Sequence, residues 1–284
     1  MKNNILLSDW FAQARSELSS SLSEEPLSSL YAILEKNTGA AREQLIADQQ
    51  FTLDAPMLPQ LEGDLLDLKN GKPLAYILGS WDFYGLPFFV NPAVLIPRPE
   101  TELLVETALE ILKQKAAPSF LVDVGTGSGC IAAAIGKNYS DTRIIASDVS
   151  RDALEVAQSN INRHALSKHV SLLQSSLLEG IHARFDLICA NLPYIPSQAL
   201  QELEVAYFEP HLALDGGEDG LTLFRRFFDR IPDHLAKGGS ILLEMQFDQA
   251  EMLQKLAHLH FPGAKVIIKR DLAGCDRLLV IHTV

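Results

Sequence analysis

A glycine-rich segment is the first part of the sequence whose residue types point to chemistry. Residues 120–124, Phe-Leu-Val-Asp-Val, are typical of a buried strand and run through Gly-Thr-Gly-Ser-Gly at 125–129 into a predicted helix. This order places backbone N–H groups and a helix N-terminus at the carboxyl end of a strand, where ligands bind in open α/β sheets. Glycine is needed because a Cβ atom would obstruct both the tight turn and a close ligand. Taken alone, the segment could also be a purely structural turn.

An acidic residue at the end of the next predicted strand narrows the choice of ligand. Residues 143–147 lead into Asp148, whose carboxylate can accept hydrogen bonds from the 2′ and 3′ hydroxyls of a ribose. The loop spacing is GxGxG, and Cys130 stands where a dinucleotide fingerprint would place its third glycine. The pattern therefore favours an adenosine ligand other than NAD.

A second candidate site follows a later strand, predicted at residues 185–190, which runs straight into Asn191, Leu192, Pro193 and Tyr194. The Asn191 side-chain oxygen and the Leu192 carbonyl are two acceptors that could hold an NH2 group, and Tyr194 offers a flat apolar face to a planar substrate. An amide or aromatic amine nitrogen is a poor nucleophile until its N–H groups are held and its lone pair is directed at the electrophilic carbon. Orientation can supply much of the catalysis, so no general acid or base is assigned. An ordinary turn is the alternative for these four residues alone.

Alternating strands and helices must position these groups. From residue 99 onward, apolar strands alternate with amphipathic helices, as in a parallel sheet covered on both faces. The predicted strands are residues 120–124, 143–147, 170–174, 185–190, 240–244, 264–269 and 277–282. The predicted helices are residues 101–114, 129–138, 151–164, 221–235 and 248–258.

The N-terminal part follows a different pattern. Residues 1–75 contain helix-period segments at 10–20, 26–36, 41–48 and 59–69, which predict a small helical domain. Residues 76–97 are rich in aromatic and β-branched residues with glycines between them, which favours a β-hairpin linker before a domain over 98–284. The predicted fold class is α/β: a seven-stranded Rossmann-like sheet with a smaller N-terminal helical domain.

Composition argues against several classes of function. The formal net charge of the 284 residues is -12, which is a disadvantage for neutralising phosphates, so we expect no stable nucleic-acid partner. No run approaches the roughly 20 apolar residues of a membrane span, and the N-terminus lacks a secretory pattern, so we expect no membrane and a cytoplasmic location. The three cysteines and eight histidines are scattered, which predicts neither a disulfide framework nor a metal site.

The glycine loop with Asp148 resembles the class I S-adenosylmethionine methyltransferases, whose first motif is similar to VDVGTGSG and whose sheet has seven strands with the last antiparallel. Residues 191–194 resemble the (N/D)PPY signature of methyltransferases that act on amino groups attached to planar systems, with Leu192 in place of the first proline. That group includes DNA adenine and cytosine enzymes and release factor glutamine enzymes.

Further segments resemble the release factor glutamine methyltransferase family, of PrmC or HemK type. They are PLAYILG at 73–79, WDFYGL at 81–86, LIPRPETE at 95–102, Glu209-Pro210 and ALDGGEDGL at 213–221, so the resemblance covers most of the chain. Relatives often have an acidic residue where Ser176 stands, and Leu177 could still supply an apolar wall near an adenine. Glu244-Met245-Gln246 stands where the family usually has Glu-Ile-Gly.

The resemblance implies a monomeric enzyme that transfers a methyl group from S-adenosylmethionine to the glutamine side chain of a Gly-Gly-Gln loop in peptide chain release factors. The helical domain would contribute to substrate recognition. The implied catalytic residue is Asn191. The implied cofactor-binding residues are Gly125, Thr126, Gly127, Ser128, Gly129, Asp148, Leu177 and Asn191, and the implied substrate-binding residues are Asn191, Leu192, Pro193 and Tyr194.

Two other functions stay open at this point. A methyltransferase for adenine in DNA or RNA would use the same motif to orient an exocyclic amine, but it would need a basic groove. A binding protein that keeps the cofactor fold without activity is the second, with Leu192 as its supporting feature.

Overall fold

The computed structural model describes residues 4–18, 26–48, 50–115 and 119–284 of the chain. It divides into two compact units, residues 1–80 and 81–284.

The first unit is helical. Its helices are α1 (Leu7–Leu18), α2 (Pro26–Thr38), α3 (Arg42–Ala47), α4 (Leu58–Lys69) and α5 (Leu74–Leu78), and β1 (Ile5–Leu6) pairs antiparallel with β2 (Thr52–Leu53). The four predicted helices are present; residues 19 and 20, predicted to end the first, lie outside the described residues. The core includes Trp10, Leu34 and Leu61. Buried Asp64 on α4 accepts from the Lys36 ammonium on α2 at 2.9 Å, which ties these helices together.

The predicted hairpin is shorter than expected. Residues 74–78 form α5, which ends at Gly79 in the left-handed conformation (φ 68°), so the β-hairpin predicted from residue 76 begins only at Ser80. The hairpin consists of β3 (Ser80–Phe83) and β4 (Leu86–Phe89), and its two turn residues both have positive φ, as a two-residue hairpin turn requires. Phe83 and Phe88 are buried in the core of the second unit. This anchors most of the hairpin to that unit's sheet domain.

A seven-stranded sheet forms the centre of the second unit over the described residues. Its strands are β5 (Ser119–Val124), β6 (Thr142–Asp148), β7 (Val170–Gln174), β8 (Phe185–Ala190), β9 (Leu235–Glu244), β10 (Lys265–Arg270) and β11 (Asp276–His282). Their order is β10-β11-β9-β8-β5-β6-β7, and β11 runs antiparallel to both its neighbours. The predicted sheet, with its last strand antiparallel, is confirmed.

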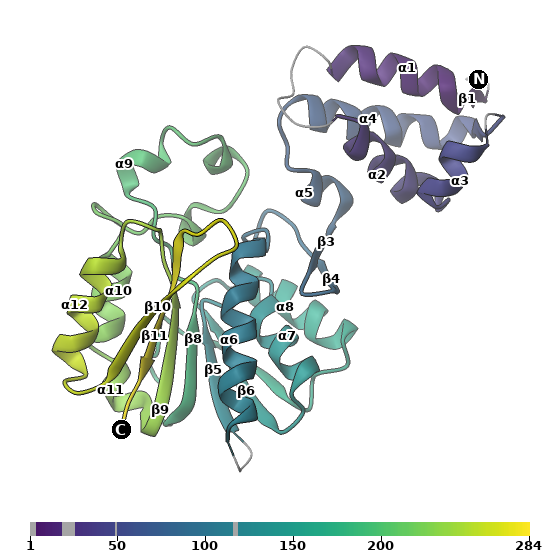
Figure 1. Cartoon of the computed structure of the whole chain (residues 1–284). Coiled ribbons are helices and arrows are strands. Elements are labelled where there is room, and N and C mark those ends of the chain that lie inside the picture. The colour runs from purple at the N-terminus through teal and green to yellow at the C-terminus, as the bar shows by residue number, and fades with distance from the viewer. Residues whose placement is uncertain (1–3, 19–25, 49, 116–118) are drawn as a thin grey trace. The chain divides into compact units, whose positions relative to one another are not determined.

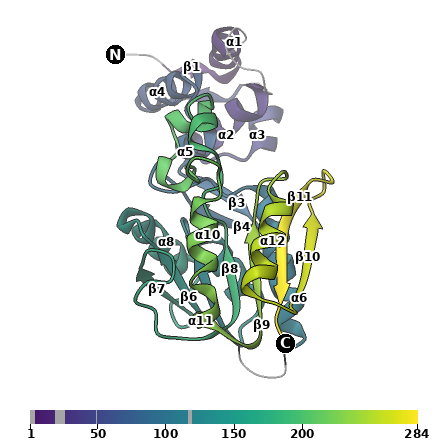
Figure 2. The ribbon, with the colours of Figure 1, turned by 90° about the vertical axis from the view of Figure 1, so that its left-hand side faces the viewer.

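Helices cover both faces of this sheet (Figure 1). On one side lie α6 (Glu102–Lys113), α7 (Cys130–Asn138) and α8 (Arg151–Arg163), and on the other lie α10 (Thr222–Phe228) and α12 (Ala250–His260), as Figure 2 also shows. Each face has its own apolar core. The short helix α9 (Ser197–Leu200) follows β8.

The helix predicted over residues 221–235 is interrupted. It divides into α10 and α11 (Ile231–His234), with Pro232 in the first turn of α11, and β9 already begins at Leu235. Proline lacks an N–H and fits the start of a helix better than its interior, which accounts for the break.

The sheet order creates one favoured place for a ligand. From β5 the chain proceeds outward to β6 and β7, then returns to β8 on the other side of β5. At such a switch point the connections leave in opposite directions and open a crevice at the carboxyl ends of the strands. Both candidate motifs, after β5 and after β8, therefore lie at this crevice. Within the described residues, no helix is both long and apolar enough to cross a bilayer.

Candidate active site

The glycine loop after β5 requires its glycines for different reasons. Gly125, Gly127 and Gly129 all have positive φ, at 74°, 54° and 80°. A Cβ atom on Gly129 would lie 3.2 Å from the Ala157 Cβ on α8, while one on Gly125 would lie 3.6 Å from the Asn191 carbonyl oxygen. The loop thus packs closely against α8 and against the segment after β8.

Asp148, at the end of β6, is held by the same loop. Its Oδ2 accepts from the Gly127 N–H and its Oδ1 from the Ser150 N–H, both at 2.9 Å. Burial raises the pKa of Asp148, and the two N–H donors oppose that shift. A carboxylate has about four acceptor positions, so each oxygen can still accept one hydroxyl hydrogen. The geometry fits a ligand with two adjacent hydroxyls.

A second carboxyl group lies beneath the loop. Asp123 on β5 is fully buried and accepts from the Thr126 hydroxyl at 2.6 Å. Its Oδ1 has no hydrogen-bond partner among the described residues. Burial raises the pKa of Asp123 to about 7. The position of Asp123 fixes Thr126 and with it the conformation of the loop.

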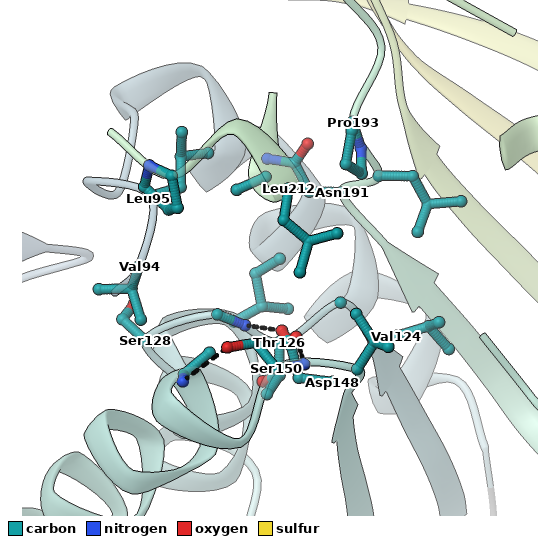
Figure 3. A pocket seen from close by; sticks show the side chains of 18 of the residues that line it. Val94, Leu95, Val124, Thr126, Ser128, Asp148, Ser150, Asn191, Pro193 and Leu212 are labelled. Carbon is teal, nitrogen blue, oxygen red and sulfur yellow. Dashed lines mark hydrogen bonds between the residues drawn. The ribbon is translucent and has the colours of Figure 1, made fainter. Parts of the chain in front are cut away.

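A single pocket at the switch point brings the two candidate motifs together. In Figure 3, Thr126, Asp148 and Ser150 lie along one side, and Asn191, Pro193 and Leu212 lie along the other. Leu177 also lines the pocket and adopts a positive φ of 55°, which is uncommon for a residue other than glycine. Most residues suggested by the sequence line this pocket: Gly125, Thr126, Gly127, Ser128, Asp148, Leu177, Asn191, Leu192 and Pro193.

Two of the suggested residues do not line it. Gly129 packs against α8, and Tyr194 packs at the edge of the apolar core beneath α10 and α12. Burial raises the pKa of the Tyr194 phenol to about 12. A role for Tyr194 in covering a planar substrate stays a prediction.

The Asn191 side chain is oriented by a residue from a distant segment. Its Nδ2 donates to the Thr101 hydroxyl at 3.2 Å. Thr101 belongs to the short 3-10 helix Pro99–Thr101 before α6, within the PRPETE string, and it too lines the pocket. No role for Thr101 is predicted from the sequence, because no local pattern shows that residues 90 positions apart will touch.

The segment after Asn191 is clamped by the DGGEDG loop. The Gln249 side chain donates to the Tyr194 carbonyl at 3.0 Å. A Cβ atom on Gly216 would lie 2.8 Å from the Tyr194 Cα, and one on Gly220 would lie 2.3 Å from the Tyr194 carbonyl oxygen. The backbones touch, so these glycines allow the loop to hold the Asn191 segment in place.

An ion pair connects the remaining motifs. The Arg98 guanidinium donates to Glu209, whose other carboxylate oxygen accepts from the Ile96 N–H at 3.0 Å. The Glu209 side chain is only 2% exposed. Because Arg98 and Pro210 both line the pocket, this pair fixes two parts of its wall.

The chain is a methyltransferase of the seven-stranded α/β class. Residues 99–207 match the model of the methyltransferase small domain, and residues 9–79 match that of the PrmC N-terminal domain. The fold is similar to the crystal structure of a methyltransferase from Pyrococcus furiosus, with a TM-score of 0.51 and 18% identity over 78% of this chain and 96% of that one. At this identity the similarity concerns the fold alone.

Two curated relatives define the family. A release factor glutamine methyltransferase from Flavobacterium psychrophilum is 34% identical over 98% of this chain and 99% of its own length. One from Geobacter sulfurreducens is 44% identical over 77% of this chain and 76% of its own. The chain belongs to the release factor glutamine methyltransferase family, which confirms the resemblance identified from the motifs.

Proposed function

We propose that the protein transfers a methyl group from S-adenosylmethionine to the side-chain amide nitrogen of the glutamine in the Gly-Gly-Gln loop of peptide chain release factors. One observation carries the proposal: the Asn191 amide is held by Thr101 at the carboxyl end of β8, in the same pocket as the glycine loop and Asp148. The names of the curated relatives support the same substrate.

The residues present fit S-adenosylmethionine. Asp148 would bind the ribose hydroxyls through its remaining acceptor positions, the glycines of residues 125–127 would allow close approach to the backbone, and Leu177 would form an apolar wall. When bound, the cofactor supplies a methyl group that its sulfonium charge has already activated.

The protein's part in the reaction is orientation. The Asn191 Oδ1 and the Leu192 carbonyl would accept the two N–H groups of the substrate amide, which aims the nitrogen lone pair at the methyl carbon. Asn191 is therefore the proposed catalytic residue, and Leu192, Pro193 and Tyr194 are proposed to complete the substrate site. No acid or base is needed beyond the solvent that takes the released proton.

A nucleic-acid substrate fits the site less well. The pocket wall in the described part of the chain carries two cations, Arg98 and Arg226, and Arg98 is engaged by Glu209. A chain of net charge -12 with such a pocket offers little to a phosphate backbone.

From membership of the family, we further propose that the enzyme is monomeric and cytoplasmic and has no stable nucleic-acid partner. Residues 1–75 are proposed to contribute to recognition of the release factor.

Methyl transfer from labelled S-adenosylmethionine tests the proposal directly. Purified release factor, the same factor with Gly-Gly-Gln→Gly-Gly-Ala, DNA and rRNA would be compared as substrates. We expect label on the intact factor alone. With Asn191→Ala, turnover should fall by about 100-fold or more, because orientation is lost, while the Kd of the cofactor changes little. Label on nucleic acid, or full turnover by the variant, would contradict the proposal.

A further inference from the structure

Glu244, the last residue of β9, is a buried carboxyl group that the proposed function does not use. Glu244 is only 1% exposed, and it does not line the pocket. The Thr101 and Asn191 side chains approach its carboxylate as hydrogen-bond donors that lower its pKa, and its Oε2 has no hydrogen-bond partner among the described residues. The register of the sheet explains this, because Ala190 on β8 pairs in parallel with Leu243 on β9, so that the residues following each lie side by side. Glu244 therefore stands directly behind the Asn191 amide.

The direction of these hydrogen bonds is determined by the carboxylate. An ionised carboxylate only accepts hydrogen bonds, so the single hydroxyl hydrogen of Thr101 points to Glu244. The Thr101 oxygen can then only accept from Asn191, and the structure shows the Asn191 Nδ2 donating to it at 3.2 Å. The hydrogen bond between Asn191 and Glu244 uses the same NH2 group. The NH2 group of Asn191 thus faces the back of the site, which leaves Oδ1 for the pocket.

We propose that Glu244 is a positioning residue, which acts directly and through Thr101 to keep the oxygen of the Asn191 amide, and not its NH2 group, facing the substrate. The inference rests on the proposed function, because the substrate amide must itself present N–H groups. If the side-chain amide of Asn191 were flipped by 180°, its NH2 group would face the NH2 group of the substrate. Such an enzyme would bind its cofactor but would turn over poorly.

The charge on Glu244 gives the arrangement a pH dependence. Burial raises the pKa of Glu244 to about 7, while the two hydrogen bonds and the nearby Arg277 oppose that shift. The other titratable groups that interact with it are Glu100, which raises its pKa further, and Tyr194 and Cys130, whose own pKa values burial raises to about 12, so both are neutral at pH 7. Below about pH 7 the protonated carboxyl could donate to Thr101 and reverse the chain of hydrogen bonds. Turnover at saturating substrates should therefore decline as the pH falls through this range.

Glu244→Gln tests the inference with little change of shape. The new amide can donate or accept, so it no longer enforces one direction. We expect kcat with release factor to fall by about 10- to 100-fold, the value of a lost hydrogen bond to a charged group, and the decline below pH 7 to flatten. The Kd of the cofactor and the Tm should stay close to those of Glu251→Gln, a matched control at an exposed carboxylate. Unchanged kcat in Glu244→Gln would overturn the inference.

A compensating pair of substitutions separates positioning from general structural damage. Asn191→Asp places a second carboxylate against Glu244, so two acceptors oppose each other and turnover should drop sharply. In the double variant with Glu244→Gln, the introduced NH2 group can donate to the introduced carboxylate, and kcat should rise again by about tenfold or more. Losses that simply add in the double variant would refute the positioning role.

A third measurement does not depend on activity. In the ¹H–¹⁵N spectrum of the cofactor-free protein, the Asn191 NH2 signal can be assigned by its absence in Asn191→Asp. We expect slow hydrogen exchange in the wild type and in Thr101→Ser, and fast exchange in Glu244→Gln and Thr101→Val. If exchange follows this pattern but the wild type fails to methylate release factor, the orientation stands and the proposed substrate is wrong. Equal exchange in all variants would overturn the inference even with an active enzyme.

Discussion

The substitution Asp148→Asn offers the most direct test of the proposed binding of S-adenosylmethionine in the pocket. Asparagine keeps the shape of the side chain but replaces one oxygen with an NH2 group. In the structure, Oδ2 accepts from the Gly127 N–H and Oδ1 from the Ser150 N–H, each at 2.9 Å. Whichever way the carboxamide is turned, its NH2 group therefore meets a backbone donor. The variant cannot keep both loop contacts, and it loses an acceptor for one ribose hydroxyl.

The size of the effect follows from these contacts. A hydrogen bond to a charged group contributes about 1.5–3 kcal/mol, and the variant loses at least one such bond to the ligand. Displacement of the Gly127 or Ser150 N–H adds a smaller cost. A total of about 2–4 kcal/mol corresponds to a Kd that is about 30- to 1000-fold higher. Because the methyl-accepting side of the pocket is untouched, kcat at saturating cofactor should fall much less.

Calorimetric titration with S-adenosylhomocysteine measures this Kd directly. Asp152→Asn is the control, because it removes an exposed carboxylate nearby on α8. A 2′,3′-dideoxy analogue of the ligand provides the decisive comparison: it should bind much more weakly than the parent to wild type, but only slightly more weakly to Asp148→Asn. If the variant binds the parent within about threefold of wild type, or if the analogue loses the same affinity in both proteins, Asp148 does not bind the ribose.

Two further substitutions probe the supports of the site. Gly220→Ala places a Cβ atom 2.3 Å from the Tyr194 carbonyl oxygen, so kcat should fall about tenfold or more while cofactor affinity is retained. Its control is Gly238→Ala, because Gly238 also has a positive φ but a Cβ there would meet no atom within 4 Å. Equal kcat in the two variants would contradict the role of Gly220 in holding the Tyr194 backbone. Arg98→Ala leaves the buried Glu209 carboxylate without its cation, so the free energy of unfolding in urea should decrease by about 3 kcal/mol. A decrease below about 1 kcal/mol would show that Glu209 needs no partner.

The sequence was sufficient to predict where the two motifs meet. Parallel strands end at the same edge of a sheet, so a glycine loop after β5 and an Asn191 after β8 had to lie near each other once the alternating pattern was recognised. Thr101 and Glu244 could not be found in the same way. Their contacts with Asn191 depend on the register of β8 against β9 and on the docking of the segment before α6. Such contacts leave no local signature.

The hairpin shows a similar limit. Its aromatic residues predicted half-buried strands, but alternation does not tell which surface the buried side contacts. In the structure, Phe83 and Phe88 belong to the core over α6 and α7, and the fully buried Asn160 of α8 joins the hairpin to the glycine loop. Its side chain accepts from the Phe89 N–H at 2.7 Å and donates to the Ser128 carbonyl at 2.8 Å. A segment expected to connect two domains therefore supports the glycine loop.

Leu192 is where the sequence departs from the family motif, and the structure supplies a replacement for the missing ring. A proline would restrict the backbone at the carbonyl proposed to accept from the substrate. Leu192 is instead 3% exposed and packed in the core beneath α10 and α12, which anchors the same peptide through its side chain. Two residues later, Gly220 and Gln249 hold the Tyr194 backbone. Rigidity at this site is therefore a property of the surrounding packing, and Leu192 is compatible with an active enzyme.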